Sequence, residues 1–453
     1  MGDKILIKID YWFKRLDFSK LSFDGLFKSS LINFFFRIIG LLLGYIFTLA
    51  ITRNFGAEAF GYYNLAFVFL QFAVILNLLG LDSTALKYSS EYASSSDKIG
   101  ASHDFYKKVS TFIISFGLSI SVLAILLSDF ISNTLFDKPE MSFHIKIIAL
   151  GILPLSLVKL NTNVLLGFKK IIPYSILHNT SIPLVAIMLL LLLSSYTENY
   201  IPTMAYSVST VIAAIVSVIF IVVKRKEVIA KSKVKVEFKN ILGVSYNMFL
   251  SSSALFIAGW IDIIMLGIFS DAASLGIYGV ASKVAKVTVL FIASIGIISA
   301  REFAAHYVNK DFESLKKSVQ NASKISFMFT TPVLVILFIF METILGFFGE
   351  TFIAAKPVLY VLLISQYLNA ITGPTDQILN MTGNHAILKN LNFISIIANI
   401  GLNLLLIPLY GIVGAAIATG FSNVFMNVSC TYFIWKRLRI VSFYLPKLNR
   451  YNF

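Results

Sequence analysis

The chain has 453 residues, of which 57% are hydrophobic and only 13% are charged, and its mean hydropathy is +0.81. Soluble domains are about half apolar and about a quarter charged, so this composition excludes a chain of ordinary soluble domains and predicts that much of it faces lipid. The net charge of +15 requires no nucleic acid as a partner, because most basic residues stand in the connections between long apolar runs.

The first 28 residues predict a segment that lies in the membrane interface and not a cleavable signal. They carry four aspartates among six basic residues and have no long apolar centre. Runs of about 20 apolar residues follow, which is the length that a helix needs to cross a bilayer. Such runs exclude barrel strands, which alternate over about ten residues. Twelve spans are predicted, at residues 29–52, 61–82, 109–131, 143–166, 173–194, 202–223, 241–267, 276–300, 324–346, 357–380, 387–408 and 411–435.

The connections between the spans predict the orientation. With the N-terminus placed in the cytoplasm, twenty-nine Lys and Arg residues fall on the inner side. Only four fall on the outer side, namely Arg53, Lys138, Lys146 and Lys356. Because basic residues concentrate in cytoplasmic loops, both termini are expected in the cytoplasm. The inner excess also favours contact with anionic lipid of the bilayer.

A basic cytoplasmic linker at residues 224–240 divides the spans into two sets of six. We expect an N-terminal lobe at residues 29–223, a C-terminal lobe at 241–435 and a basic cytoplasmic tail at 436–453. Both halves start on the same side, so an internal repeat would be parallel. A shift of 215 residues supports a repeat, because it pairs Ala57 with Ala272, Gly61 with Gly276, Tyr63 with Tyr278 and Ala66 with Ala281. The predicted fold class is an all-α polytopic membrane protein with two six-helix lobes around a central cleft.

Basic side chains inside the spans are costly in lipid and are expected to face a cavity or a partner. The alternative is that a long basic side chain extends along the span and places its charge at the membrane interface. This alternative suits Lys159 and Arg301, which lie near span ends, better than the other basic residues within the spans. A cationic cavity predicts an anionic substrate, above all one with phosphates, because Arg and Lys bind phosphate oxygens. The candidate substrate-binding cations are Arg37 in the first span, Lys159 in the fourth, and Lys283, Lys286 and Arg301 along the eighth.

Two further side chains are candidates for ion coupling. Asp262 in the seventh span is either a coupling carboxylate or a partner for a lysine. His178 in the fifth span can titrate near physiological pH, although a lone histidine in a span is also a common packing residue. The chain has no phosphate-binding loop, zinc-protease motif or serine-hydrolase motif. No catalytic residue, cofactor or metal is therefore predicted, and the energy source would be an ion gradient, the membrane potential or consumption of product.

With these features together, the chain resembles the Wzx-type polysaccharide flippases of the multidrug/oligosaccharidyl-lipid/polysaccharide (MOP) exporter superfamily along nearly its whole length. The likeness rests on residues 33–40 (NFFFRIIG), 53–63 (RNFGAEAFGYY), 80–83 (GLDS), 166–169 (LGFK) and 410–416 (YGIVGAA). It implies a V-shaped fold in the bacterial inner membrane that carries an undecaprenyl-diphosphate-linked glycan, such as an O-antigen, capsule or exopolysaccharide unit, to the periplasmic leaflet. Arg37, Lys283 and Lys286 would meet the diphosphate. A polysaccharide polymerase and a chain-length regulator are the partners that the resemblance suggests.

Two other functions stay open at this point. A multidrug or cation antiporter of the same superfamily would carry a carboxylate in the N-terminal lobe, where the first span has Arg37 and the second has only Asp82 at its inner edge. A membrane-embedded polysaccharide polymerase would need a substantial outer loop with catalytic groups, and the outer connections of this chain are short. A lipid II flippase usually has two more helices than this chain can supply.

Overall fold

The structure is a computed structural model that describes residues 25–94, 101–193, 195–223 and 237–444. Within these ranges every regular element is a helix. The predicted interfacial segment falls almost entirely outside the described residues, as do most of the linker and half of the C-terminal tail. What was predicted for those segments stays a prediction.

The first half of the chain folds into helices α2 to α10, and the second half into α12 to α19. The first half has α2 (Gly25–Leu78), α3 (Leu81–Ser94), α4 (Ala101–Leu126), α5 (Ser128–Phe130), η2 (Ile131–Leu135), α6 (Met141–Ala149), α7 (Ile152–Gly167), α8 (Ile171–Ser175), η3 (Ile176–Thr180), α9 (Ser181–Leu192) and α10 (Ile201–Val223). The second half has α12 (Phe238–Phe269), α13 (Ala272–Ala285), α14 (Val287–Val308), α15 (Phe312–Ile339), α16 (Met341–Phe348), η4 (Glu350–Ala355), α17 (Lys356–Thr372), α18 (Thr375–Met381) and α19 (His385–Leu438).

The number of membrane crossings follows from the lengths of these helices. Among the described residues, nine helical segments are long and apolar enough to cross a membrane, or ten when the pair α6 and α7, bent by 43°, counts as one span. Helices α2 and α19 have 54 residues each, whereas one crossing needs about 20. Each is interrupted at one glycine with positive φ, Gly56 (81°) in α2 and Gly411 (56°) in α19, and so it crosses twice. The predicted fold class with twelve spans is confirmed.

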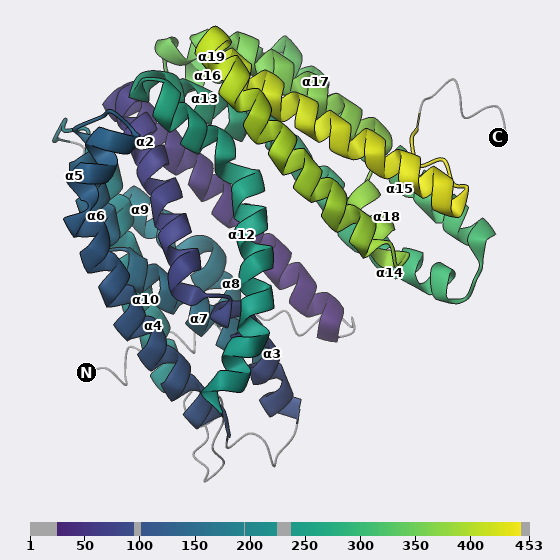
Figure 1. The fold of residues 1–453 in the computed structure, drawn as a ribbon, viewed down its shortest axis with the longest axis horizontal. Helices are drawn as coiled ribbons and strands as arrows, with labels where there is room; N and C mark the ends of the chain where they lie inside the picture. Colours follow the sequence, from purple (N-terminus) through teal and green to yellow (C-terminus); the bar gives the residue numbers. More distant parts are fainter. Residues whose placement is uncertain (1–24, 95–100, 194, 224–236, 445–453) are drawn as a thin grey trace.

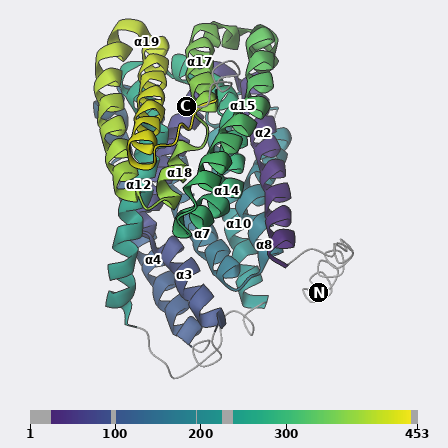
Figure 2. The ribbon, with the colours of Figure 1, turned by 90° about the vertical axis from the view of Figure 1, so that its right-hand side faces the viewer.

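The two lobes meet at one end and diverge toward the other (Figure 1). We call the two ends the contact end, where Arg53 of α2 meets Phe347 of α16, and the open end, where α3 and the turn between α14 and α15 lie. Helix α2 runs from the open end to the contact end and turns back at Gly56. Helix α12 packs along α2 and α3 as well as along α19, and Figure 2 shows it continuing beside α3 and α4.

The burial pattern separates a lipid-facing surface from a continuous core. Large apolar side chains stand exposed on the outside of the helices, for example Leu126, Leu192 and Leu409 at more than 70% exposure. The main buried cluster runs from the first half into α12, α13 and α17, and a smaller one joins α14, α15, α18 and α19. The core therefore spans both lobes at the contact end.

The turn that the sequence repeats forms the crossing between the lobes. A Cβ atom added to Gly61 of α2 would lie 1.8 Å from the carbonyl oxygen of Ala272, and one added to Gly276 of α13 would lie 2.0 Å from that of Ala57. Small residues allow such close approach of helix backbones. The 215-residue shift superposes Ala57 on Ala272 and Gly61 on Gly276, and each glycine contacts the alanine of the other pair. Such reciprocal contacts are expected at a two-fold axis between repeats.

Candidate functional site

A cluster of polar side chains lies inside the N-terminal lobe. The Nζ atom of Lys159 on α7 donates a hydrogen bond of 3.1 Å to Oε1 of Gln71 on α2. Arg37, Lys159 and Asp82 are all close enough to His178 to act on it electrostatically. The fold therefore brings together three of the predicted site residues, Arg37, Lys159 and His178, from three helices.

A π-helical turn positions His178 beside Arg37. Turns of this kind insert one residue into a helix and are frequent at functional sites; here the turn is η3. Its Asn179 packs against Gly40 of α2, where an added Cβ would lie 2.2 Å from the Asn179 carbonyl oxygen. The His178 ring is exposed and stacks on Tyr174 with centroids 5.1 Å apart. Gly40 thus serves close packing, which holds η3 one turn away from Arg37.

A second polar cluster surrounds Asp262 of α12 in the C-terminal lobe. Its Oδ1 atom accepts a hydrogen bond from Nδ2 of Asn403 at 3.0 Å, and its Oδ2 atom accepts from the Tyr278 hydroxyl at 2.9 Å and from the Thr419 hydroxyl. Asn403 also donates to Oδ1 of Asn399 at 2.9 Å. The Oδ1 atom of Asn403 is buried and has no hydrogen-bond partner among the described residues. Six side-chain oxygen atoms thus converge within one lobe.

Lys286 is connected to the cluster of Lys159 through one turn of α2. Lys286 is exposed, and its ammonium lies over the Trp260 ring at 5.5 Å from the centroid. Trp260 in turn contacts Phe67 of α2, with ring centroids 5.4 Å apart. Phe67 stands four residues before Gln71, the partner of Lys159, so both lie on the same face of α2. Lys159 thus contacts this turn of α2 directly from the N-terminal lobe, and Lys286 approaches it from the C-terminal lobe through the Trp260 ring.

The other two predicted cations lie elsewhere. Lys283 of α13 donates to the Gly44 carbonyl oxygen of α2 at 2.8 Å and to the Thr48 hydroxyl, and the Tyr45 hydroxyl donates to the Lys283 carbonyl at 2.6 Å. Lys283 therefore joins the lobes in this conformation. Arg301 is exposed on α14 toward the open end. The line of cations expected along one helix is interrupted at Lys286, where α13 ends and α14 begins.

Cations on the predicted outer side also join the lobes. Arg53 donates from Nε to the Phe347 carbonyl at 2.6 Å and from Nη2 to that of Gly346 at 3.2 Å, and Lys138 donates to the Gly267 carbonyl at 2.6 Å. These carbonyls belong to the last turns of α16 and α12 and lie at the negative end of each helix dipole; the Gly346 carbonyl also accepts from the backbone N–H of Gly349 at 3.1 Å.

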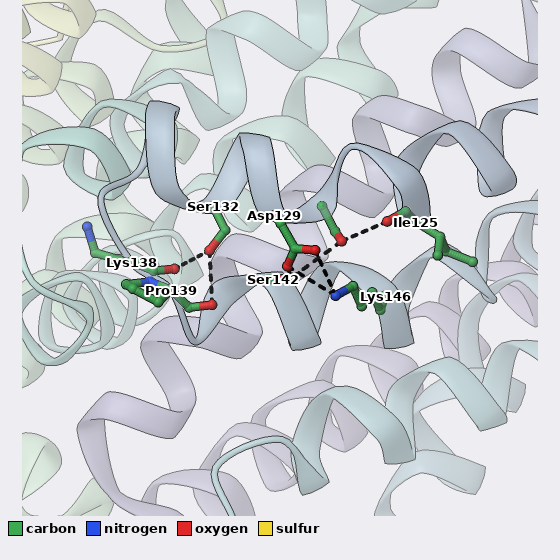
Figure 3. Close-up of polar contacts among 8 residues, drawn as sticks. Ile125, Asp129, Ser132, Lys138, Pro139, Ser142 and Lys146 are labelled. Atoms are coloured by element: carbon green, nitrogen blue, oxygen red, sulfur yellow. Dashed lines mark hydrogen bonds and ion pairs between the residues drawn. The ribbon is translucent and has the colours of Figure 1, made fainter.

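The loop that carries Lys138 is held by its own hydrogen bonds. Ser132 donates to the carbonyls of Lys138 and Pro139, and Ser142 donates to Asp129, which also pairs with Lys146 at 3.1 Å. Figure 3 shows the Lys138 side chain pointing away from these contacts. Burial lowers the pKa of Lys138, and the nearby Asp271 and Asp137 carboxylates oppose this shift.

Several of these residues were missed by sequence reasoning. Asn399 and Asn403 are amides one turn apart inside a span, and intramembrane polar residues of that kind are a usable signal. Gln71 has the same character. Arg53 and Lys138 were counted only as exceptions to the charge bias. The described residues contain no group of three or more His, Cys, Asp or Glu side chains that could hold a metal ion.

The helices, the parallel repeat and the paired polar clusters define a multi-pass membrane protein with the fold of the MOP-superfamily transporters. A family model for polysaccharide biosynthesis proteins matches residues 26–300, and a MatE model matches residues 248–405. The first match covers more than half of the chain, so the protein belongs to the polysaccharide biosynthesis protein family. The sequence resemblance to flippases of this superfamily is thereby confirmed.

Individual relatives agree with this assignment. The chain is 29% identical to the probable low-salt glycan biosynthesis flippase Agl15 of Haloferax volcanii over 201 residues, which are 43% of this chain and 42% of that protein. The match thus spans less than half of the length of the relative.

Solved structures agree in fold at low sequence identity. An inward-facing multidrug resistance MATE transporter matches with a TM-score of 0.74 at 15% identity, over 90% of this chain and 97% of that chain. The lipid II flippase MurJ in an inward closed conformation matches with a TM-score of 0.72 at 17% identity, over 92% and 90% of the two chains. An outward-facing MATE transporter gives 0.60 at 16% identity, over 91% and 95%. These matches show that the chain shares the fold of these transporters.

Proposed function

We propose that this protein is a flippase that moves an undecaprenyl-diphosphate-linked oligosaccharide repeat unit from the cytoplasmic to the periplasmic leaflet of the bacterial inner membrane. Family membership and the glycan-flippase name of one relative support the substrate class. The observation that carries the proposal is the pair of cations, Lys159 and Lys286, which approach one turn of α2 from opposite lobes. The unit belongs to an O-antigen, a capsule or an exopolysaccharide, and a polymerase with its chain-length regulator uses it on the far side.

The cations divide the work between binding and entry. Arg37 and Lys159 of the N-terminal lobe, with Lys286 of the C-terminal lobe, hold the diphosphate, since Arg offers forked donors and Lys a point charge. The exposed Arg301 meets the headgroup on its way in from the open end. Lys283 joins the binding set when its contacts with α2 break. The polyprenyl chain stays in lipid throughout.

Transport follows from rocking of the two lobes about the crossing of Gly61 and Gly276. We take residues 29–223 and 241–435 as the two moving bodies, with the open end in the cytoplasm as the charge bias of the connections indicates. Alternating access of this kind needs a binding site between the bodies and a contact that alternates between the two ends. The hydrogen bonds of Arg53 and Lys138 are the contact at the periplasmic end.

Asp262 supplies the ion coupling. One carboxylate, two amide oxygens and two hydroxyls make a set of hard oxygen ligands with a single negative charge, which suits a proton or a monovalent cation such as Na⁺. The unpartnered Oδ1 atom of Asn403 supports this assignment, because a buried polar atom is usually hydrogen-bonded or serves a ligand. His178, beside Arg37, is the second candidate for a proton step.

A multidrug antiporter is the alternative, and the MatE match over residues 248–405 is the observation that favours it. Cationic drugs would need an acidic site. In the N-terminal lobe, the charged groups that act on His178 among the described residues are two cations, Arg37 and Lys159, and one carboxylate, Asp82. This balance favours an anionic substrate.

The test uses cells that lack this protein and retain the glycan pathway. Lipid-linked glycans are extracted, and their sidedness is measured with a membrane-impermeant glycosidase. Complete units trapped on the inner leaflet are expected, and the wild-type gene should restore export. Accumulation of the units on the outer leaflet would instead indicate a polymerase. Normal export in cells that lack the protein would contradict the flippase function and favour the drug antiporter.

Charge reversal at the site sharpens this test. Arg37→Glu should lower rescue by about tenfold to a hundredfold, because one charge-assisted hydrogen bond is worth about 1.5–3 kcal/mol. Lys107→Glu is the matched control, since Lys107 is exposed on α4 and lies outside both clusters. Full rescue by Arg37→Glu at normal protein level would remove Arg37 from the site.

A further inference from the structure

Helix α13 contacts the N-terminal lobe along one face. At 100° per residue, Gly276, Gly279 and Lys283 fall within about 60° of one another. Gly276 touches the backbone of Ala57, and a Cβ added to Gly279 would lie 2.5 Å from Nδ2 of Asn64. Lys283 donates to α2 from the same face. Helix α13 belongs to the C-terminal lobe by sequence, yet its main helix partner is α2.

The opposite face of α13 reaches into the polar cluster of its own lobe. Tyr278 stands in the same turn as Gly276 and Gly279 but points about 130° away from their face. Its ring is 1% exposed, and its hydroxyl donates to Oδ2 of Asp262 at 2.9 Å and lies 3.4 Å from Thr419. One helical turn therefore connects the carboxylate to the lobe crossing.

Ion occupancy at Asp262 conflicts with the hydrogen bond that Tyr278 makes. A cation or a proton held between Oδ2 of Asp262 and the two hydroxyls needs oxygen lone pairs facing it, whereas Tyr278 presents a hydrogen to Oδ2. The Thr419 hydroxyl can rotate freely about its C–O bond. The phenol hydrogen prefers the ring plane, so the Tyr278 hydroxyl must take its other in-plane position or the buried ring must move. Because interiors are close-packed, movement of the ring displaces the turn of α13 that carries Gly276 and Gly279.

We propose that Tyr278 is a positioning residue that transmits ion occupancy at Asp262 to the crossing of α13 with α2, and so sets the balance between the two lobe arrangements. This inference rests on the proposed ion coupling at Asp262. A ligand shifts a conformational equilibrium only when it binds the two states with different affinity. Tyr278 supplies that difference, since its hydrogen bond to Oδ2 is made when this side of the carboxylate is empty and is displaced when an ion or proton occupies the space between Oδ2 and the two hydroxyls.

The experiment separates ion binding from the conformational response. The full chain is purified into lipid nanodiscs with spin labels on Glu91→Cys of α3 and Asn309→Cys of the α14–α15 turn, in a Cys430→Ala background. Both labelled positions are exposed at the open end, so their distance reports how far the lobes diverge there. NaCl is titrated against choline chloride at constant ionic strength, and the same samples are titrated with pH. Binding is followed separately as the ion-dependent rise in the thermal unfolding midpoint.

Tyr278→Phe keeps the buried ring and removes only the hydroxyl. We expect this variant to keep a saturable rise in the unfolding midpoint while it loses the ion-induced change in the label distance. Tyr63→Phe, at the repeat-related position on α2, is the matched control and should keep both responses. A Tyr278→Phe variant whose distance responds like that of the wild type would overturn the inference.

Asp262→Asn separates the inference from the function on which it rests. It should lose the rise in the unfolding midpoint and the distance change together. If the wild-type protein shows neither response to Na⁺ nor to pH, ion coupling at Asp262 is wrong, and the role of Tyr278 is overturned with it. Glycan export can be normal in that case, so the flippase assignment is tested independently by the glycosidase assay.

Discussion

The contact at Arg53 allows a quantitative prediction about the balance between the two lobe arrangements. Its guanidinium donates to the carbonyls of Phe347 and Gly346 across the lobe boundary. A buried charged hydrogen bond is worth about 1.5–3 kcal/mol, but this side chain is exposed, so water and salt screen most of that energy. A cation at a helix C-terminus retains about 0.3–1 kcal/mol. We therefore expect about 1 kcal/mol in favour of the closed contact end, which is about a fivefold change in the equilibrium constant.

Arg53→Ala should shift the population by this factor toward the arrangement with the contact end open. The spin labels at Glu91→Cys and Asn309→Cys measure it, because opening of the contact end brings the labels closer together. Arg53→Lys keeps the charge but not the forked donors, so its population should lie between those of Arg53→Ala and the wild type.

Salt supplies the control for this reasoning. At about 1 M KCl, where the screening length is about 3 Å, the wild-type distance distribution should approach that of Arg53→Ala, and the variant should change little. A variant distribution identical to that of the wild type at low salt would refute the assignment of Arg53 as a contact that sets the equilibrium. An equal response of both proteins to salt would assign the salt effect to other charges.

Two further predictions concern the same end of the molecule. Gly61→Ala should lower the thermal unfolding midpoint, since its Cβ would lie 1.8 Å from the Ala272 carbonyl oxygen and overpacking costs about 1–3 kcal/mol. Gly44→Ala is the control and should not lower the midpoint, because nothing lies within 4 Å of its Cβ. Equal midpoints for the two variants would contradict the close contact between α2 and α13 at Gly61. Because burial lowers the pKa of Lys138 in the closed state, closing releases a proton in the alkaline range, and stability of the closed state rises with pH there. Raising the pH toward the ordinary lysine pKa of 10.5 should therefore lengthen the distance between the two spin labels at the open end. Lys138→Gln should abolish this pH dependence. A label distance that shortens as the pH rises would refute the role given to Lys138.

The spans were predictable because lipid imposes a length and a composition on every crossing. The break between the first two spans was expected as a polar stretch, and the structure reduces it to one residue. Gly56 alone leaves helical geometry, at a φ of 81° that glycine adopts without strain. Composition locates such a turn, but only the backbone shows that helix continues on both sides of it.

The candidate site was less predictable because each partner lies on another helix. Asp262 was identified from its charge, but its hydrogen bonds come from Tyr278, Asn403 and Thr419, which stand on α13 and on both halves of α19. Helical periodicity fixes the face that a residue occupies and not the neighbour that this face meets. Lys283 shows the consequence: its helical position predicted that it faces a cavity, but could not predict that its ammonium contacts Gly44 of α2.

The four cations on the predicted outer side show why exceptions to a charge rule carry information. A cation on the translocated side opposes the bias that orients the chain, so its retention needs a local reason. Lys146 and Lys356 pair with Asp129 and Glu342 within their own lobes, at 3.1 and 2.9 Å. Arg53 and Lys138 reach the carbonyl ends of α16 and α12 across the boundary, and Lys138 also donates to the Phe136 carbonyl of its own lobe at 3.0 Å. Under the proposed rocking of the lobes, hydrogen bonds to helix ends are a suitable contact at this end, because water can replace each of them when the lobes part.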